Sequence, residues 1–255
     1  MTTDTNRPVK TVETAFKILE LIQDANGIRF TTLVDELDMA KSTVHRHLGT
    51  LESNGFLVRN GKEYHIGLRF LDYGIYARNH QYGYELARAK TRELAEETNE
   101  LCVFMVEEHG RGYILCREKG ANAVETGTRV GKCLYLHATA GGKSILSQYT
   151  PDHVEAILDT WGLPSRTKST ITSRSEFVEE IELIRKRGYA LSYEEHIIGL
   201  QTVGVPITDG TGRVVGALCI SGPTNRVAGH FLEEEIPDLL LGAANEIELN
   251  LTYDR

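Results

Sequence analysis

The order of elements in the first 66 residues constrains the fold of this chain more than any other feature of its sequence. Apolar residues recur at helical spacing in three short segments, 12–22, 31–37 and 41–53. The first segment follows Thr11 as a candidate N-cap, and the second opens on the capping-box pattern Thr-x-x-Asp. The core-facing residues predicted for the first segment are Val12, Ala15, Phe16, Leu19 and Ile22. The sequence thus predicts three amphipathic helices in close succession.

A tight hairpin follows these helices. The short runs 56–59 and 62–66 flank Asn60-Gly61, a dipeptide that favours a two-residue type I′ turn. Three helices followed by a two-stranded hairpin make a winged helix-turn-helix, whose third helix is built to enter the major groove of DNA. We therefore predict such a domain over residues 1–67.

The rest of the chain predicts a linker helix and a larger second domain. Leu68, Leu71 and Ile75 have helical spacing and precede a polar, glycine-bearing stretch, so we assign 68–83 to the linker and 84–255 to the second domain. The strands expected there are 101–107, 111–117, 124–130, 189–193, 201–207 and 213–221, and the helices are 84–98, 140–148, 151–161, 174–187 and 231–252. Antiparallel hairpins with helices beside them indicate an α+β fold, with a GAF/PAS-like second domain.

The charge of the chain is unevenly distributed. The net charge is −8, yet residues 1–70 contain nine basic and nine acidic residues, so the excess of acid lies after residue 70. Within 39–62, four basic residues are opposed by Glu52 alone. A small basic zone on an acidic protein suits a molecule that binds phosphates with one face and repels them elsewhere.

The composition predicts neither a membrane segment nor secretion. No apolar run approaches the roughly 18–20 residues of a membrane helix, and the N-terminus MTTDTNRPVK lacks the apolar core of a signal peptide. The four cysteines are widely spaced and form no CxxC pair. We therefore expect reduced cysteines and a cytoplasmic location.

The outward face of the third helix carries the candidate DNA contacts. If Val44, Leu48 and Leu51 face the core, then hydroxyl, imidazole and cationic side chains face outward, where such groups can bind bases and phosphates. Two further basic residues flank the hairpin tip. The candidate DNA-binding residues are Lys41, Ser42, Thr43, His45, Arg46, His47, Thr50, Arg59 and Lys62. The alternative is that this face is only solvated or binds protein.

Four ordered segments of the sequence resemble a known family. They are AKSTVHRHLGTLESNGFLVRNGKEYHIG, LYLHATAGGKSIL, GYALSYEEHIIGLQTVGVPITDGTGRVVGALCISGP and AANEIELNL. In order and spacing they resemble the IclR family of bacterial and archaeal transcription regulators, over nearly the whole chain. The resemblance implies a winged-helix DNA-binding domain, a dimerising linker helix and an effector-binding domain for small organic acids, sugars or aromatic metabolites. It also implies homodimers or homotetramers that bind palindromic operators in double-stranded DNA.

The same resemblance implies an effector pocket where the turn HATAGGKS meets two strands near the C-terminus. The residues implied are Ala140, Gly141, Ser192, Leu200, Thr202, Cys219 and Ser221. Alternation along the strand puts Cys219 and Ser221 on one face, and Gly141-Gly142 before a helix would offer free backbone N–H groups to a carboxylate. The alternative is that the glycines form only a tight turn and Cys219 only packs in the core. Ser192 stands where relatives often carry an acidic residue and Thr202 where they can carry Cys. The resemblance therefore does not identify the effector.

Three other motifs do not support a catalytic or metal site. Gly142-Lys143-Ser144 resembles the end of a P-loop, but His137 stands where the first glycine of that motif would be. Cys133 and His137 lack a second pair of metal ligands, and Glu194-Glu195-His196 lacks an accompanying nucleophile. We assign no catalytic residue, no metal and no cofactor.

These observations predict a non-enzymatic, sequence-specific transcription regulator whose operator affinity responds to a small metabolite. The alternative is a metabolite-binding protein or enzyme whose winged helix is a protein-interaction module. The sequence does not specify the effector, the operator, or whether the protein represses or activates.

Overall fold

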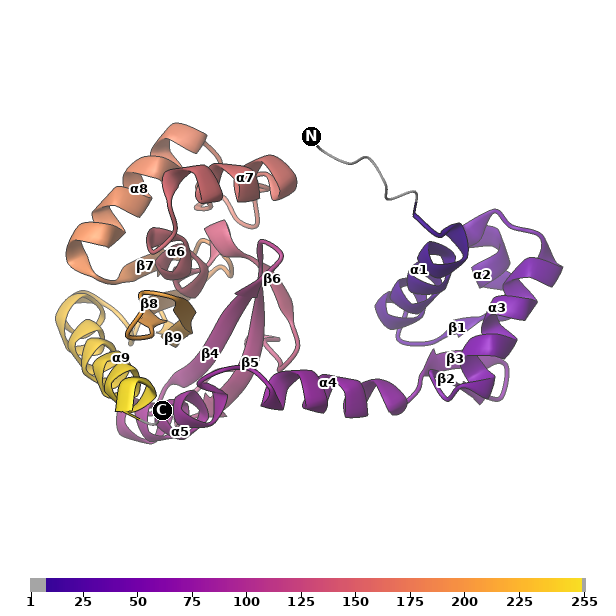
Figure 1. Ribbon diagram of the computed structural model, residues 1–255, viewed down its shortest axis with the longest axis horizontal. Coiled ribbons are helices and arrows are strands. Elements are labelled where there is room, and N and C mark those ends of the chain that lie inside the picture. The colour runs from indigo at the N-terminus through magenta and orange to yellow at the C-terminus, as the bar shows by residue number, and fades with distance from the viewer. Residues whose placement is uncertain (1–7, 254–255) are drawn as a thin grey trace. The chain divides into compact units, whose positions relative to one another are not determined.

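The computed structural model describes residues 8–253 and divides the chain into two compact units, with the boundary between Ala77 and Arg78. The elements of the N-terminal unit are α1 (Lys10–Asp24), β1 (Ile28–Arg29), α2 (Phe30–Leu37), α3 (Lys41–Ser53), β2 (Leu57–Asn60), β3 (Glu63–Ile66) and most of α4 (Arg69–Asn79) (Figure 1). Strand β3 pairs antiparallel with both β1 and β2. The predicted winged helix-turn-helix is confirmed.

The side of α1 that faces the core of this unit differs in part from the predicted one. Ile18 and Ile22 are buried in it, at 0% and 1% exposure, whereas Val12 and Phe16 remain 48% and 59% exposed. The prediction is confirmed for Ile22 and wrong for Val12 and Phe16, because α1 has apolar residues on two adjacent sides and helical periodicity alone does not choose between them. The second side stays at the surface of the unit.

Two predicted helix starts also differ from the structure. Helix α1 begins at Lys10 with Val9 as its N-cap, so Thr11 lies inside the helix, and α2 begins at Phe30, so Thr32 lies in its first turn. Neither N-cap residue makes a side-chain capping hydrogen bond. The pairing of Ile28–Arg29 with β3 fixes the chain just before α2, and this long-range contact sets the start of the helix.

The wing turns one residue later than the sequence predicts. Asn60 pairs with Glu63, so the two turn residues are Gly61 and Lys62. Gly61 has a φ of +61° and Lys62 does not have a positive φ. This pattern matches a type II′ turn, in which glycine takes the first central position, and it places Lys62 at the tip of the wing.

The C-terminal unit contains one antiparallel sheet. Its elements are α5 (Tyr84–Thr98), β4 (Leu101–Glu108), β5 (Arg111–Lys119), β6 (Cys133–Tyr135), η1 (Leu136–Ala138), α6 (Ala140–Ser147), α7 (Pro151–Trp161), α8 (Arg174–Arg187), β7 (Ala190–Tyr193), β8 (Leu200–Thr208), β9 (Val214–Pro223), η2 (Phe231–Glu235) and α9 (Ile236–Tyr253). The strand order is β6-β5-β4-β9-β8-β7, and neighbouring strands are antiparallel throughout. The predicted α+β class is confirmed.

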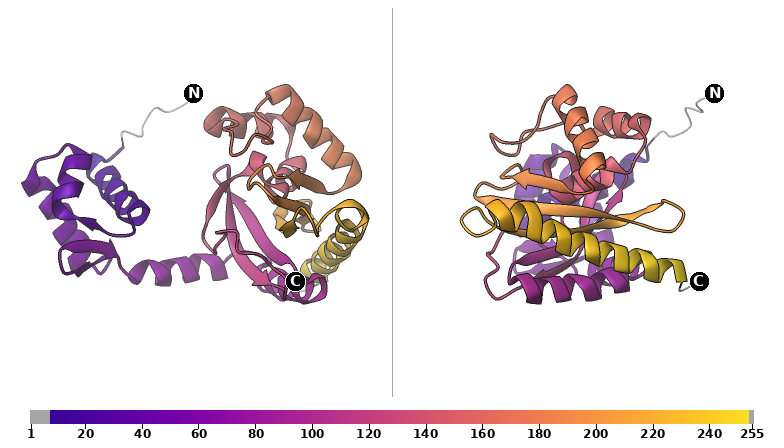
Figure 2. Two further views of the ribbon diagram at one scale, coloured as in Figure 1. Left: turned by 180° about the vertical axis from the view of Figure 1, so that it is seen from behind. Right: turned by 90° about the vertical axis from the view of Figure 1, so that its left-hand side faces the viewer.

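The sheet has a separate hydrophobic core on each face. Alternate residues of β4 enter the two cores: Phe104 packs with residues of α5 and α9, and Met105 packs with residues of α6, α7 and α8. Figure 1 shows the two groups of helices on opposite sides of the sheet, and Figure 2 shows α5 and α9 side by side. A site between α6 and the sheet is therefore enclosed within one core, on the face away from α5 and α9.

One predicted strand of this unit does not form. The segment 124–130 is irregular, because Gly127 and Gly131 adopt φ values of +65° and +77° that an extended strand does not allow. The edge of the sheet is instead the short strand β6, in which Cys133 pairs with Tyr113 of β5. The irregular segment is free to line the face of the sheet beside it.

We expect replacement of Ile18 by Ala to destabilise the N-terminal unit by about 2–5 kcal/mol, since the lost methylenes leave a cavity in its core. Hydrogen exchange of peptides from 8–66, measured by mass spectrometry on the full chain, should accelerate about 30-fold or more. The matched control Glu20→Ala changes an exposed residue of the same helix and should stay within about 0.5 kcal/mol. Equal exchange in the two variants would contradict the placement of Ile18 in the core.

Candidate functional site

Helix α3 presents a polar face rich in hydrogen-bonding groups. Val44 and Leu48 are buried and Leu51 is half-buried, as predicted. Five of the predicted DNA contacts on this helix are exposed and two, Thr43 and His47, are half-buried; the exposed ones are Lys41, Ser42, His45, Arg46 and Thr50. The Thr50 hydroxyl donates to the carbonyl of Arg46 at 2.9 Å, so it is already engaged within the helix. The guanidinium of Arg46 is the strongest candidate for reading a base.

The two basic residues of the wing have different surroundings. Arg59 Nε donates to the carbonyl of Gly61 at 3.1 Å, and its guanidinium lies 5.7 Å from the centre of the Tyr64 ring. Arg59 therefore stabilises the wing in addition to any contact with DNA. Lys62 is exposed at the tip and is placed to contact a phosphate.

Arg69, at the start of α4, was missed by the sequence analysis. Its Nη1 donates to the carbonyl of Asn54, at the C-terminal end of α3, over 2.6 Å. Its guanidinium lies 5.0 Å from the centre of the Phe56 ring. The centre of the Phe56 ring lies 4.9 Å from the centre of the Phe70 ring and 5.8 Å from that of the Tyr73 ring. A cation at the C-terminus of a helix is favourable. This cluster fastens the first turns of α4 to the end of α3.

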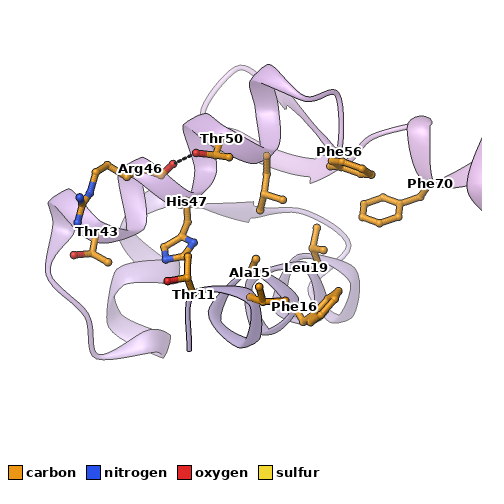
Figure 3. Close-up of a pocket in the computed structure, with 12 residues that line it drawn as sticks. Thr11, Ala15, Phe16, Leu19, Thr43, Arg46, His47, Thr50, Phe56 and Phe70 are labelled. Atoms are coloured by element: carbon orange, nitrogen blue, oxygen red, sulfur yellow. Dashed lines mark hydrogen bonds between the residues drawn. The ribbon is translucent and has the colours of Figure 1, made fainter. Parts of the chain in front are cut away.

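An apolar groove runs between α1 and α3 of the same unit. It has a volume of about 520 Å³. Figure 3 shows α1 residues Phe16 and Leu19 on one side, His47 of α3 opposite, and Phe56 and Phe70 at one end. The groove is lined by the side of α1 that the sequence analysis placed in the core. A second apolar surface of this unit therefore remains uncovered in the described chain.

In the C-terminal unit, the structure brings all seven predicted effector contacts to one small cavity between α6 and the sheet. The cavity has a volume of about 60 Å³. The seven predicted residues in its lining are Ala140, Gly141, Ser192, Leu200, Thr202, Cys219 and Ser221. They come from α6, β7, β8 and β9, which are far apart in sequence. Their role in binding stays a prediction, but their convergence is a fact of the fold.

The backbone amides at the turn are predicted to be free, but in the structure they already have hydrogen-bond partners. Thr139 caps α6 by accepting the N–H of Gly142 at 3.1 Å, and the backbone N–H of Gly141 bonds to the Cys219 sulfur. Burial raises the pKa of the Cys219 thiol to about 12, so it stays protonated at neutral pH. The idea that these glycines offer bare amides to a carboxylate is therefore wrong, since side chains of the protein already use them.

Hydroxyl groups supply the polar wall of the cavity instead. The hydroxyls of Thr202 and Ser221 lie 2.9 Å apart on neighbouring strands and bond to each other. In such a pair one hydroxyl donates, and the O–H of the other remains available to a ligand. A ligand with oxygen acceptors is suited to this wall.

The lysine of the P-loop-like motif has a structural role. The Lys143 side chain is 1% exposed, and its Nζ lies 2.7 Å from Glu195 and 3.1 Å from Glu180. Burial raises the pKa of Glu195, and the neighbouring ammonium of Lys143 opposes that rise. Thr170 also donates to the Glu195 carbonyl at 2.6 Å. These contacts tie α6 and α8 to the loop between β7 and β8.

The two residues considered as metal ligands have other partners. Cys133 accepts a hydrogen bond from Arg111 Nε at 3.4 Å, and His137 Nε2 bonds with the carbonyl of Pro164 at 3.1 Å. Burial lowers the pKa of His137, which favours its neutral form. Among residues 8–253 no group of three His, Cys, Asp or Glu side chains is arranged to hold a metal ion.

Part of the cavity lining was missed by the sequence analysis. Met105 and Ile114 reach it from β4 and β5, Thr128 from the irregular segment, and His196 and Ile197 from the loop between β7 and β8. The loop residues belong to a segment that carries the family resemblance, but no spacing rule points a loop toward a cavity. Only the fold assigns these five residues to the site.

Comparisons with known proteins agree with this architecture. Residues 83–249 match the family described as bacterial transcriptional regulator IclR C-terminal, and residues 11–61 match the IclR helix-turn-helix domain. A probable HTH-type transcriptional regulator ArcR of Halobacterium salinarum is 30% identical over 249 residues, 96% of this chain and 95% of the relative. The transcriptional repressor IclR of Escherichia coli is 28% identical over 247 residues, 94% of this chain and 89% of the relative.

A solved structure extends the likeness to three dimensions. The crystal structure of the Thermotoga maritima IclR protein superposes with a TM-score of 0.76 at 30% identity, covering 96% of this chain and 99% of that one. The chain belongs to the IclR family. Proteins of this family are metabolite-responsive transcription regulators, and this IclR-family chain contains both the DNA-binding and the effector-binding domain. The predicted family and function are confirmed.

The two matched regions correspond to the two candidate sites of this IclR-family protein. The helix-turn-helix match spans α1 to the tip of the wing, and the C-terminal match spans α5 to most of α9. Across residues 8–253, no helix has the length and apolar character needed to cross a lipid bilayer.

Two substitutions separate base reading from phosphate contact. Arg46→Ala should weaken binding to a cognate operator by about 1–3 kcal/mol and relax the preference at one base position. Lys62→Ala should weaken binding to all sequences alike and reduce the slope of log K against log salt by about one unit. Fluorescence anisotropy titrations at several salt concentrations measure both, with DNA upstream of the protein's own gene as the first operator to try. Parent-like behaviour of both variants would refute the assignment of recognition helix and wing.

Proposed function

We propose that this protein binds a palindromic operator as a dimer or a pair of dimers, and that a small metabolite in the α6 cavity sets its operator affinity. The observation that carries the proposal is the convergence of residues from α6, β7, β8 and β9 on one small cavity. Binding sites are usually enclosed, largely apolar spaces with a few polar groups. The Thr202–Ser221 hydroxyl pair supplies polar groups in a lining that is otherwise largely apolar.

Helix α4 is the element through which we expect the cavity to influence DNA binding. It is the segment of chain that leads from one unit to the other, and Arg69 and Phe70 fix its first turns to the end of α3. A change in the direction of α4 would therefore carry the recognition helix with it. A coupling of about 1–3 kcal/mol changes operator affinity roughly 5- to 150-fold.

We propose that a second copy of the chain covers the apolar side of α4 and the groove beside α1. No residue of α4 is buried, and Leu71 and Ile75 are 58% and 40% exposed. One winged helix reads a single half-site, and a palindromic operator requires a two-fold partner with half-sites about one helical turn, or a multiple, apart. An exposed apolar surface on the reading unit suits such a partner.

The substitution Leu71→Glu tests this assembly, because a carboxylate on the apolar side of α4 must be desolvated in the dimer. Light scattering should show the parent as a dimer or tetramer at micromolar concentration. The variant should already be dissociated at protein concentrations at least ten times higher than those at which the parent dissociates. Asn79→Glu adds the same charge at the end of α4 and serves as the control. A monomeric parent, with and without operator DNA, would count against the proposal.

An enzyme or metabolite-binding protein with an interaction module remains the alternative function, and the comparisons disfavour it. The relatives reported above are named transcriptional regulators or repressors. The proposal needs no catalytic residue and no cofactor, since regulation requires only a difference in effector affinity between two states.

A substitution that fills the cavity tests whether an effector bound there sets operator affinity. Ser221→Leu should remove the response to effector and leave effector-free operator affinity within about twofold, since the added side chain occupies ligand space in the C-terminal unit, whereas α3 belongs to the N-terminal unit. The effector is first found by screening metabolites for a rise in melting temperature, as a ligand at 100 times its Kd adds roughly 2.7 kcal/mol. Ser175→Leu, at an exposed site on α8, is the matched control. A folded Ser221→Leu protein with a full response would place the sensor elsewhere.

Gly141 is not a suitable position for such a test. A side chain at this glycine would collide with the sulfur atoms of Met105 and Cys219. Substitution there would disturb the packing of α6 on the sheet, so loss of response would not distinguish a blocked cavity from a damaged core.

A further inference from the structure

The loop between β7 and β8, residues 194–199, lies on the side of the effector cavity that solvent reaches. The lining residues from β4, β5 and β9 are all buried, whereas His196 and Ile197 of this loop are half-buried. Thr128 of the irregular segment, which also lines the cavity, is half-buried as well. The path from solvent to the buried part of the lining therefore passes this loop.

The 194–199 loop is closed on itself and turns sharply at both ends. Glu194 and Gly199 have φ values of +61° and +80°, a left-handed region that is common for glycine and uncommon for glutamate. The Glu194 carboxylate accepts the backbone N–H of Gly199 at 2.6 Å, which joins the two ends of the loop. Uncommon backbone angles concentrate at ligand clamps and switch regions, and hinges are residues at the ends of loops and elements. The loop thus has the form of a small flap with two hinge positions.

One residue of the loop, Glu195, makes the contacts that hold the flap against the rest of the domain. Its Oε1 accepts from the Nζ of Lys143 at 2.7 Å, and its backbone carbonyl accepts from the Thr170 hydroxyl at 2.6 Å. Lys143 lies on α6 one turn beyond Ala140, which lines the cavity. The ion pair therefore joins the loop to the helix on the opposite side of the cavity.

Lys143 can release the loop without losing its last carboxylate. Its side chain is 1% exposed, and its Nζ also lies 3.1 Å from Glu180 of α8, which Arg187 holds at 3.2 Å. A buried ammonium that loses its only partner is strongly destabilising, so this second carboxylate lowers the cost of opening. The Glu195 Oε2 atom is buried without a hydrogen-bond partner while the loop is closed, and it would gain water on opening. The arrangement suits a contact that breaks and reforms.

We propose that the 194–199 loop is the gate of the cavity and that Lys143 and Glu195 are positioning residues that hold this gate closed. Opening moves Lys143 from two carboxylates to Glu180 alone and exposes the cavity lining to solvent. Neither positioning residue lines the cavity, so they act on effector access and not through contact with the effector. The inference rests on the proposed function only in taking this cavity as the effector site.

The Cys219 thiol reports on the gate without any effector. It is 2% exposed and lines the cavity, whereas Cys102 is 0% exposed in the core on the other face of the sheet. The small thiol reagent methyl methanethiosulfonate should reach Cys219 when the loop opens and Cys102 only when the domain unfolds. Mass spectrometry of peptides from the treated full-length protein gives the modification rate at each cysteine.

Neutralising the two carboxylates should shift the rate at Cys219 in opposite directions. Glu195→Gln weakens the contact that closes the loop, so Cys219 modification should accelerate about tenfold or more. Glu180→Gln removes the carboxylate that Lys143 keeps in the open state, so Cys219 modification should slow about threefold or more. A network with only a structural role would give acceleration in both variants.

The control variant is Glu179→Gln, at an exposed position of α8, which should leave the rate at Cys219 within about twofold of the parent. The rate at Cys102 should stay within about twofold in all three variants. Parallel acceleration at both cysteines would indicate a loosened domain and overturn the proposal. An unchanged Cys219 rate in Glu195→Gln, or a faster one in Glu180→Gln, would overturn it as well.

The parent protein gives a second test that does not depend on the folding of a variant. A local opening exposes little surface and depends weakly on denaturant, whereas global unfolding depends on it steeply. Below the unfolding transition in urea, the rate at Cys219 should therefore stay nearly constant while the rate at Cys102 rises. A parallel rise at both cysteines would contradict a local gate.

The Ser221→Leu experiment separates this inference from the proposed function. If both carboxylate substitutions shift the Cys219 rate as expected and the folded Ser221→Leu protein keeps its full effector response, the proposed function fails and the gate stands. If Ser221→Leu loses the response and neither carboxylate substitution changes the Cys219 rate, the gate fails and the proposed function stands.

Discussion

The close approach of helix α6 to the sheet is the constraint on which the effector-binding domain depends. A Cβ atom on Gly204 of β8 would lie 2.6 Å from backbone atoms of Ala140 and Gly141, so the helix backbone rests directly on the strand. This contact leaves room for only a small cavity and brings the first turn of α6 against Cys219. It also directs Lys143 into the interior, where a buried ammonium requires its two carboxylate partners.

A second constraint acts at the start of α4. Arg69 joins the carbonyl of Asn54, the C-cap of α3, to the linker helix and covers the Phe56 ring, which in turn packs on Phe70. These contacts hold the first turns of α4 against the end of the recognition helix. The first turns of the linker helix therefore belong to the N-terminal, DNA-binding unit.

Local patterns predicted those elements that local interactions control. Helix α3 has its predicted limits because Val44 and Leu48 have one possible core-facing side and Asn54-Gly55 stops the helix. Helix α7 begins as predicted, since Pro151 follows Thr150, whose hydroxyl accepts the His153 N–H. The predictions that failed depended on distant partners. The packing of α2 and α3 selected Ile18 over Phe16 on α1, and glycines with positive φ made 124–130 irregular.

The sequence by itself determined the winged helix and the α+β class through periodicity and turn residues, and the family through ordered motifs. The family resemblance in turn implied the seven residues that meet in one cavity. Tertiary structure decided which side of α1 is buried, that the turn amides are occupied, and that His196 lines the cavity. It also decided that Arg69 fastens the linker to α3. The physical reason is the same in each case. Burial, desolvation and hydrogen-bond satisfaction depend on which distant segments meet. The spacing of residues along the chain does not specify these long-range contacts.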